Sequence, residues 1–283
     1  MSCAPGIWKP YETWITNKLY FEFQRFQSRA FSTRKFTIHF SNRPEWIIPI
    51  LRGMACTRHE VNFGGLTPDF LRDCDFFVPL TMDDLKHLAQ FPDQVAHFPI
   101  PIPSMESLLL CDEKIRLNQM LGDNGFGSHI PRTGRDLPLP FILKRNTGEF
   151  GKECHLVTSD QAKDAHSDKL DSPEYFTQEL IAGPVEYATH ILFKNGKILR
   201  SLNIEYHFST AHPIKGKEQA SGLKVCRCPH LDLFASILRM LGFEGLCCFN
   251  YKVRDQRPFL LEINPRFGGS LCPYFFSFLR QIE

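Results

Sequence analysis

Three polar residues near the end of the sequence have the types and spacing of a site for phosphate and metal. Glu262, Asn264 and Arg266 follow an apolar run at intervals of two residues. Carboxylate and amide oxygens are ligands that hard cations prefer. A guanidinium group binds phosphate or acyl phosphate through a fixed fork of donors. We therefore predict Glu262 and Asn264 as metal ligands and Arg266 as a catalytic residue that holds an anion.

A strand is the element that would align these side chains. Side chains alternate along a strand, so we expect Leu261 and Ile263 on one face and Leu260, Glu262 and Asn264 on the other. A Glu-x-Asn pair by itself is also typical of a core strand that ends in a solvated turn. The longer string that follows the pair separates these alternatives.

The string Glu-Ile-Asn-Pro-Arg-Phe-Gly-Gly over 262–269 resembles the metal-binding strand of the ATP-grasp superfamily, close to the carbamoyl-phosphate synthetase type. Asn250, twelve residues before Glu262, stands where many members of that family place an acidic metal ligand. The resemblance implies Asn250 as a third ligand of Mg²⁺, with Mn²⁺ as an alternative ion. Because Asn250 is neutral, the number of ions stays open at one or two.

Two lysines and a glycine-containing loop extend the resemblance toward the N-terminus. Lys114 lies in an Asp-Glu-Lys helix that resembles the one opening the ATP-grasp domain, and an exposed lysine paired to a nearby acid is the alternative. Lys144 ends an apolar run. Gly148 and Gly151 follow it in a loop that can fold over an anion. A simple hairpin turn would have a similar sequence. The resemblance implies a loop that covers the phosphates of ATP, with Lys144 also catalytic.

A third segment resembles the hinge that holds adenine in this family. It comprises Gln178, Glu179, Leu180 and Ile181, followed by a Gly-Pro turn and Glu186. The resemblance implies that the backbone around Glu179 and Ile181 binds the base and that Glu186 holds the ribose hydroxyls. An edge hairpin with exposed acids is the alternative.

The order of these motifs predicts α/β and α+β organisation, an ATP-grasp fold with a small N-terminal parallel α/β domain. We expect an aromatic and basic segment over 1–35, either packed on the body or contacting a partner. The small domain is expected over 36–103 and the ATP-grasp domain over 104–283, with subdomains at about 104–178 and 179–283. The elements that periodicity, caps and turns predict are strands over 36–40, 60–63, 75–79, 245–253 and 259–264, helices over 45–52, 82–88, 104–121 and 231–241, and a hairpin at Asn195-Gly196.

Composition excludes several classes of protein. The chain has 283 residues, 43% hydrophobic and 23% charged, and a net charge of +2, which does not indicate a nucleic-acid binder. No apolar run approaches the roughly twenty residues of a membrane span. The ten cysteines include no Cys-x-x-Cys pair, so we expect reduced thiols in a cytoplasmic protein. The sequence leaves a homo-oligomer open.

The resemblance implies an ATP-dependent ligase that activates a carboxylate as an acyl phosphate and joins it to an amine, so its partners would be small molecules. Candidates for binding a substrate carboxylate are Arg200, Lys215, Lys217 and Arg227. A nucleotide-binding sensor or subunit without ligase activity is the alternative that Asn250 keeps open. A carboxylase or kinase acting on bicarbonate is disfavoured, because the chain lacks room for the extra domains such enzymes carry.

Overall fold

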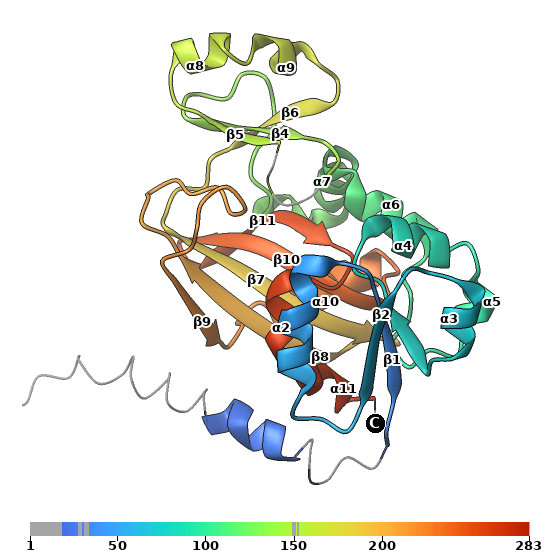
Figure 1. The fold of residues 1–283 in the computed structure, drawn as a ribbon. Coiled ribbons are helices and arrows are strands. Elements are labelled where there is room, and N and C mark those ends of the chain that lie inside the picture. The colour runs from blue at the N-terminus through green and yellow to red at the C-terminus, as the bar shows by residue number, and fades with distance from the viewer. Residues whose placement is uncertain (1–18, 28–29, 31–33, 149–150, 152, 283) are drawn as a thin grey trace, which may run out of the picture.

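The computed structural model describes residues 19–27, 30, 34–148, 151 and 153–282 (Figure 1). Three β-sheets organise this part of the chain. None of its helices has both the length and the apolar character that a membrane span needs. Most of the predicted N-terminal segment lies outside the described residues.

The described part of that segment, residues 19–27, is a helix that packs on the body of the chain. Phe21 is buried against Tyr274, with ring centroids 4.8 Å apart. Arg200 Nη2 donates to Gln24 Oε1 over 3.1 Å. Of the two alternatives left by the sequence, the structure therefore shows packing on the body for this helix.

A small parallel sheet with strand order β2-β1-β3 follows (Figure 1). Its elements are β1 (Thr37–Ser41), α2 (Pro44–Met54), β2 (Glu60–Gly64), α3 (Pro68–Arg72), β3 (Phe76–Val78), α4 (Met82–Leu88) and α5 (Pro92–Val95). Pro44 fits the first turn of α2 because its missing N–H is not needed there. Thr81 caps α4 by accepting from the Asp84 N–H. The predicted parallel α/β arrangement is confirmed.

Two short helices connect this sheet to the rest, where the sequence predicted one helix over 104–121. They are α6 (Met105–Asp112) and α7 (Lys114–Leu121). Glu113 between them has φ −90° and ψ 89°, which interrupts the helix. The predicted end at Leu121 is confirmed, since α7 ends there with Gly122 as its C-cap, and the chain continues through the separate helical turns Gly122–Phe126 and Gly127–His129.

A second sheet, small and antiparallel, has the order β5-β4-β6. Its elements are β4 (Phe141–Arg145), β5 (Cys154–Val157), α8 (Asp160–Asp164), α9 (Ser167–Asp171) and β6 (Tyr175–Glu179). Helices α8 and α9 cover its outer side, at the top of Figure 1, and the large sheet lies on the other side.

The large sheet is antiparallel, with the order β11-β10-β7-β8-β9. Its elements are β7 (Val185–Lys194), β8 (Lys197–His207), β9 (Gly222–Cys226), α10 (Leu231–Met240), β10 (Gly245–Arg254) and β11 (Arg257–Asn264), followed by the 3-10 turn Gly269–Tyr274 and α11 (Phe276–Leu279). The predicted Asn195-Gly196 hairpin joins β7 to β8, with both residues at positive φ.

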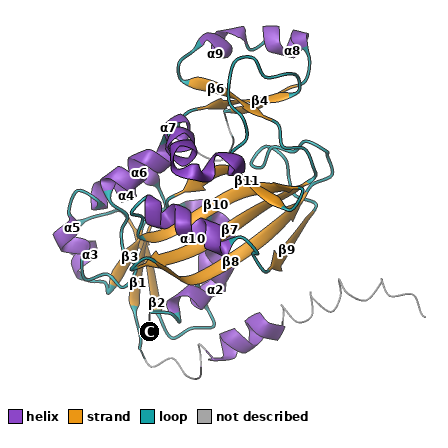
Figure 2. Cartoon of the chain, turned by 180° about the vertical axis from the view of Figure 1, so that it is seen from behind, coloured by secondary structure: helices purple, strands orange, loops and turns teal. Residues whose placement is uncertain are grey.

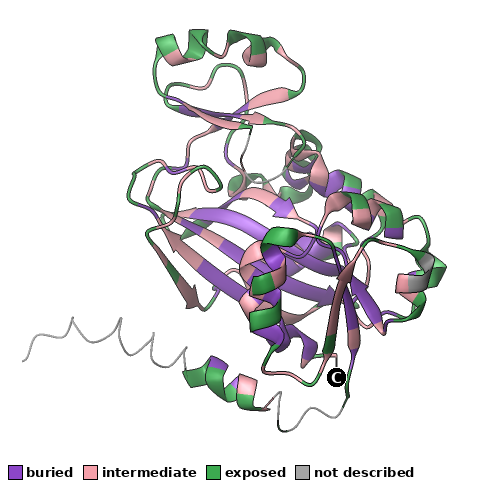
Figure 3. Cartoon of the chain, in the orientation of Figure 1, coloured by how far each residue is buried: buried purple, intermediate pink, exposed green. Residues whose placement is uncertain are grey.

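The two faces of the large sheet pack differently. Ile191 and Phe249 face the hydrophobic cluster that α10 completes, seen in front of the sheet in Figure 2. Leu192 and Leu246 face the opposite cluster, which contains α2 and α11. The strands in the middle of this sheet are therefore largely buried (Figure 3).

A β-bulge changes the predicted alternation of β11. Asn250 pairs with Glu262, but its neighbour Tyr251 pairs with Leu260, so Leu261 is the extra residue. Leu260 therefore joins Ile263 in the buried cluster, contrary to the prediction from strict alternation. Glu262 and Asn264 share a face as predicted, because both lie beyond the bulge.

Candidate active site

A pocket of about 610 Å³ lies between the large sheet and the small antiparallel sheet. All the residues that the sequence predicted as catalytic, cofactor-binding or metal-ligating line it. They are Lys114, Lys144, Gly148, Gly151, Gln178, Glu179, Leu180, Ile181, Glu186, Asn250, Glu262, Asn264 and Arg266. The structure thus brings together motifs that are up to about 150 residues apart in the sequence. Glu149, Phe150 and Lys152 of the predicted covering loop lie outside the described residues.

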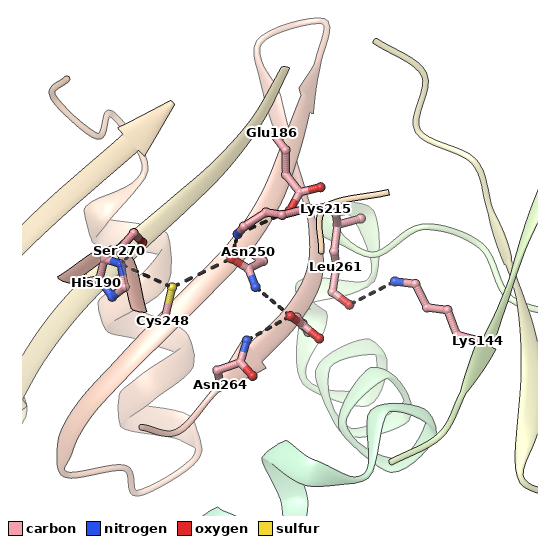
Figure 4. Close-up of polar contacts among 10 residues, drawn as sticks. Lys144, Glu186, His190, Lys215, Cys248, Asn250, Leu261, Asn264 and Ser270 are labelled. Atoms are coloured by element: carbon pink, nitrogen blue, oxygen red, sulfur yellow. Dashed lines mark hydrogen bonds and ion pairs between the residues drawn. The ribbon is translucent and has the colours of Figure 1, made fainter. Parts of the chain in front are cut away.

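Glu262 is the central carboxylate of this pocket. Its Oε1 accepts from Asn250 Nδ2 over 2.6 Å and from Asn264 Nδ2 over 2.9 Å (Figure 4). Burial alone would raise the pKa of Glu262, but the charges of Lys114 and Lys144 and these amide donors lower it overall. Glu262 is therefore ionised at neutral pH, and its carboxylate oxygens can coordinate a metal ion.

The donor set suits one hard cation. Both amides give their nitrogen to the same carboxylate oxygen, so each amide oxygen faces elsewhere. Asn264 lies two residues after Glu262, and its amide oxygen offers a second hard ligand beside the Glu262 carboxylate. The oxygen of Asn250 accepts from Lys215 Nζ over 2.7 Å, so this oxygen already has a hydrogen-bond donor and is not available to the metal. Among the described residues, no group of three His, Cys, Asp or Glu side chains is arranged to hold a metal.

Lys114 and Lys144 approach the same carboxylate from the other side of the pocket. Lys114 Nζ donates to the Gly148 carbonyl over 2.9 Å, and the Lys114 backbone N–H donates to the Asn146 carbonyl over 3.1 Å. Lys144 Nζ lies 3.5 Å from the Leu261 carbonyl, which the bulge turns toward it (Figure 4). Burial and the charge of Lys144 lower the pKa of Lys114, while Glu262 opposes this shift.

The hinge end of the pocket is lined by β6 and the start of β7. Gln178 is buried, and its Nε2 has no hydrogen-bond partner among the described residues. The Glu179 side chain pairs with Arg254 over 2.7 Å, and its backbone N–H donates to the Arg132 carbonyl. The backbone N–H of Glu179 therefore already has an acceptor within the protein. Leu180 and Ile181, which follow it, line the pocket.

Glu186 is the second buried carboxylate of the pocket. Burial raises its pKa, and the charges of Lys215 and Lys252 act against that rise. Lys215 Nζ lies 3.5 Å from Glu186 Oε1. Lys252 is buried in the same wall and donates to the Gly183 carbonyl over 2.7 Å.

The end of the pocket nearest α2 contains Arg266, Trp46, His190 and Ser270. Arg266 is buried, and its guanidinium carbon lies 5.9 Å from the centroid of the Trp46 ring. His190 Nε2 lies 2.8 Å from Ser270 Oγ (Figure 4). Burial lowers the pKa of His190 to about 3, so its imidazole is neutral at physiological pH. Burial raises the pKa of the neighbouring Cys248 thiol to about 12, which excludes a thiolate nucleophile there.

Several lining residues were not singled out from the sequence. His190 shares a face of β7 with Glu186, and Cys248 and Lys252 share a face of β10 with Asn250. Strand alternation applied to those two strands would have found them. No pattern in the sequence predicts Trp46 as a pocket residue, because it belongs to helix α2 beside the N-terminal sheet.

Of the four candidates for a substrate carboxylate, only Lys215 lines the pocket. Arg200 binds the N-terminal helix instead. Lys217 and Arg227 are exposed and do not line the pocket. The structure therefore brings only Lys215 of the four into the pocket.

No protein-family model matches the sequence, and no curated protein matches it significantly. Solved structures do match the fold. A phosphoribosylamine–glycine ligase from Thermotoga maritima is 16% identical, with a TM-score of 0.66, over 88% of this chain and 75% of that one. A D-alanine–D-alanine ligase from Bacillus anthracis in complex with ATP is 14% identical, with a TM-score of 0.55, over 83% and 86%. A putative ATP-grasp superfamily protein from Archaeoglobus fulgidus is 14% identical, with a TM-score of 0.55, over 84% and 83%.

These similarities cover most of both chains in each pair. The chain therefore has the ATP-grasp fold, as the sequence motifs predicted.

Proposed function

We propose that this protein is an ATP-dependent ligase that activates a carboxylate as an acyl phosphate and joins it to an amine, releasing ADP and phosphate. The observation that carries the proposal is the charge of the pocket. The cationic side chains inside it are Lys114, Lys144, Lys215, Lys252 and Arg266, and the carboxylates inside it are Glu186 and Glu262. Three further charged lining residues are paired at the rim, namely Arg145, Glu153 and Glu179. A net of three positive charges between two sheets suits a polyphosphate.

The similar structures support the same assignment. Two of the three are ligases by name, and one of these is in complex with ATP. In this chain, we place the base beside Gln178 and the segment 180–181, and the ribose beside Glu186. The unpartnered Gln178 Nε2 would then gain an acceptor from the base, which removes the cost of a buried polar group.

The phosphates would lie between Lys144, Lys114 and Glu262. Mg²⁺ or Mn²⁺ held there by Glu262 and Asn264 would supply Lewis-acid stabilisation of the phosphoryl oxygens. Gly148 and Gly151 belong to the loop that would cover the phosphates, and covering them would keep water from the acyl phosphate. The lysines act as fixed positive charges that need no rearrangement during the reaction.

Arg266 would bind the phosphoryl group during its transfer. It lies at the end of the pocket nearest Trp46, beyond Asn264 along the chain. Its planar fork of donors can hold two oxygens at once, which also suits the tetrahedral centre formed when the amine attacks. Positioning and charge therefore supply the catalysis in this proposal, and no covalent enzyme intermediate is needed.

The test is a screen of ADP and phosphate release over amino acids, sugar acids and other small carboxylates, each with and without a set of amines. We expect release that needs a carboxylate and an amine together, with the amide product detected by mass spectrometry. Release with bicarbonate and no amine would instead indicate the bicarbonate reaction that we disfavour. Small molecules are the only partners that this proposal requires.

A nucleotide-binding sensor without ligase activity is the second candidate, and Asn250 favours it because a neutral residue weakens metal binding. Nucleotide binding with no release of ADP for any substrate pair would support that candidate. A cytoplasmic setting belongs to the ligase proposal, supported by nine free cysteines among the described residues, all of them buried or half-buried.

A further inference from the structure

Lys215 places a fixed ammonium group beside the predicted metal ligands. Its Nζ donates to Asn250 Oδ1 over 2.7 Å and lies 3.5 Å from Glu186 Oε1 (Figure 4). The same ammonium lies 4.6 Å from the centroid of the Tyr206 ring. Three groups from β7, β8 and β10 thus surround one cation. Only 24% of the Lys215 side chain is exposed, and it lines the pocket.

The loop that carries Lys215 is held by contacts that do not involve its side chain. Glu218 Oε1 accepts from the Ile214 N–H over 3.0 Å, and Glu218 Oε2 accepts from Thr210 Oγ1. The Ala211 carbonyl accepts from the Gly183 N–H over 3.0 Å. The ammonium is therefore presented by a fixed backbone before any ligand is bound.

Asn250 connects this ammonium to the Glu262 carboxylate. Its Oδ1 faces Lys215 and its Nδ2 faces Glu262. An amide can make both contacts, since it has one accepting and one donating end. In this arrangement the Asn250 oxygen already accepts from the Lys215 ammonium group. The carboxylate of Glu262 and the amide oxygen of Asn264 are left to bind one metal ion.

We infer that the Lys215 ammonium, oriented by Asn250, takes the place of a second divalent ion at the nucleotide phosphates, so that the pocket binds one divalent ion per chain. The inference rests on the proposed function. The charge of the pocket supports the inference. The side chains inside the pocket have a net charge of +3, and one divalent ion raises this to +5. ATP with about four negative charges and one substrate carboxylate would neutralise these charges. A second divalent ion would leave an excess of positive charge in a partly buried site.

The test counts Mn²⁺ ions by electron paramagnetic resonance on the full chain saturated with the β,γ-imido analogue of ATP. We expect one bound ion per chain for the wild type. Lys215→Met combined with Asn250→Asp removes the ammonium and restores an acidic ligand, so we expect two ions. Lys215→Arg keeps the charge and should keep one ion. Lys217→Met on the same loop is the matched control, because Lys217 is exposed and does not line the pocket.

A second measurement is the affinity for the same analogue with a chelator present. The wild type should retain binding without metal, and Lys215→Met should weaken it about tenfold, the loss expected for one charge-assisted hydrogen bond. Thermal melting establishes that each variant is folded before it is counted.

Two ions on the wild type, or one ion on the double variant with the analogue bound, would overturn the inference and leave the proposed function standing. Absence of analogue binding to the folded wild type would instead overturn the proposed function.

Discussion

Arg266 is the residue on which the proposed phosphoryl transfer depends most. It is buried, it lines the pocket, and its Nη1 donates to the Phe267 carbonyl over 3.0 Å. We expect Arg266→Ala to lower turnover about 10²–10³-fold, because a preorganised charge is lost where negative charge develops. Nucleotide affinity, measured by titration calorimetry, should change little.

Arg257→Ala is the matched control for Arg266→Ala, since Arg257 is exposed at the other end of the same strand. It should leave both quantities unchanged. Unaltered turnover of Arg266→Ala with the true substrate pair would contradict the assigned role.

His190 makes the stability of the protein depend on pH. In the folded state burial holds the pKa of His190 at about 3, whereas an unfolded histidine titrates near 6.5. The folded pKa is the lower one, so the stabilisation is complete above about pH 6.5. It is lost as the pH falls toward 3, by about 1.4 kcal/mol per pH unit.

We therefore expect His190→Gln to flatten the dependence of unfolding free energy on pH between about 4 and 6.5. Denaturant titrations at a series of pH values measure this slope. The exposed His97→Gln variant controls for removal of an imidazole. Equal slopes for His190→Gln and the wild type would show that His190 is not held neutral.

At the scale of the elements, two loops meet over the pocket. Gly151 has φ +61°, and a Cβ added there would lie 2.6 Å from the Lys215 carbonyl oxygen. Gly151→Ala should therefore displace the backbone that presents Lys215 and weaken binding of the ATP analogue about tenfold. The backbone strain itself should cost about 1–2 kcal/mol of stability.

Gly242→Ala separates these two effects. Gly242 does not line the pocket and also has positive φ, +57°, but an added Cβ would meet no atom within 4 Å in the described structure. This variant should share the strain and keep its affinity, as measured by calorimetry. Similar losses of affinity in both variants would mean that contact between the loops is unimportant.

At the scale of the whole molecule, the N-terminal sheet and the large sheet share one hydrophobic core. That cluster includes Phe40 and Trp46 together with Leu202, Phe267 and Phe275. The division of the chain near residues 103 and 178 stays a prediction, and we expect the N-terminal and C-terminal parts to unfold together because they share this core.

Gly53 tests this coupling. It lies inside α2, where alanine would normally stabilise the helix. An added Cβ would nevertheless lie 2.3 Å from the Cys272 carbonyl oxygen and 2.8 Å from Pro273 Cα. Gly53→Ala should therefore destabilise the protein by about 1–3 kcal/mol and lower the midpoint of a single thermal transition.

Gly122→Ala is the control for Gly53→Ala, because Gly122 has right-handed helical backbone and an added Cβ would meet nothing within 4 Å in the described structure. It should leave the midpoint unchanged or raise it. Two separate transitions in the wild type would contradict a shared core.

The sequence determined by itself those features that depend on local chemistry. Residue types, turn signals and order predicted the Asn195-Gly196 hairpin and the shared face of Glu262 and Asn264. Alternation depends only on neighbouring peptide units, so it can be predicted wherever a strand is regular. It failed at Leu261, where the bulge is set by pairing with β10.

Only the tertiary structure decided which distant groups meet. The break at Glu113 separates two helices, and the first N–H groups of the second helix, those of Lys114 and Ile115, donate to Asn146 from a distant part of the chain. Trp46 and Lys215 reach the pocket from segments about 170 residues apart. Burial, pKa shifts and the contact between Lys215 and Asn250 depend on those approaches. Local propensity carries no information about them, because they arise from the packing of separate elements.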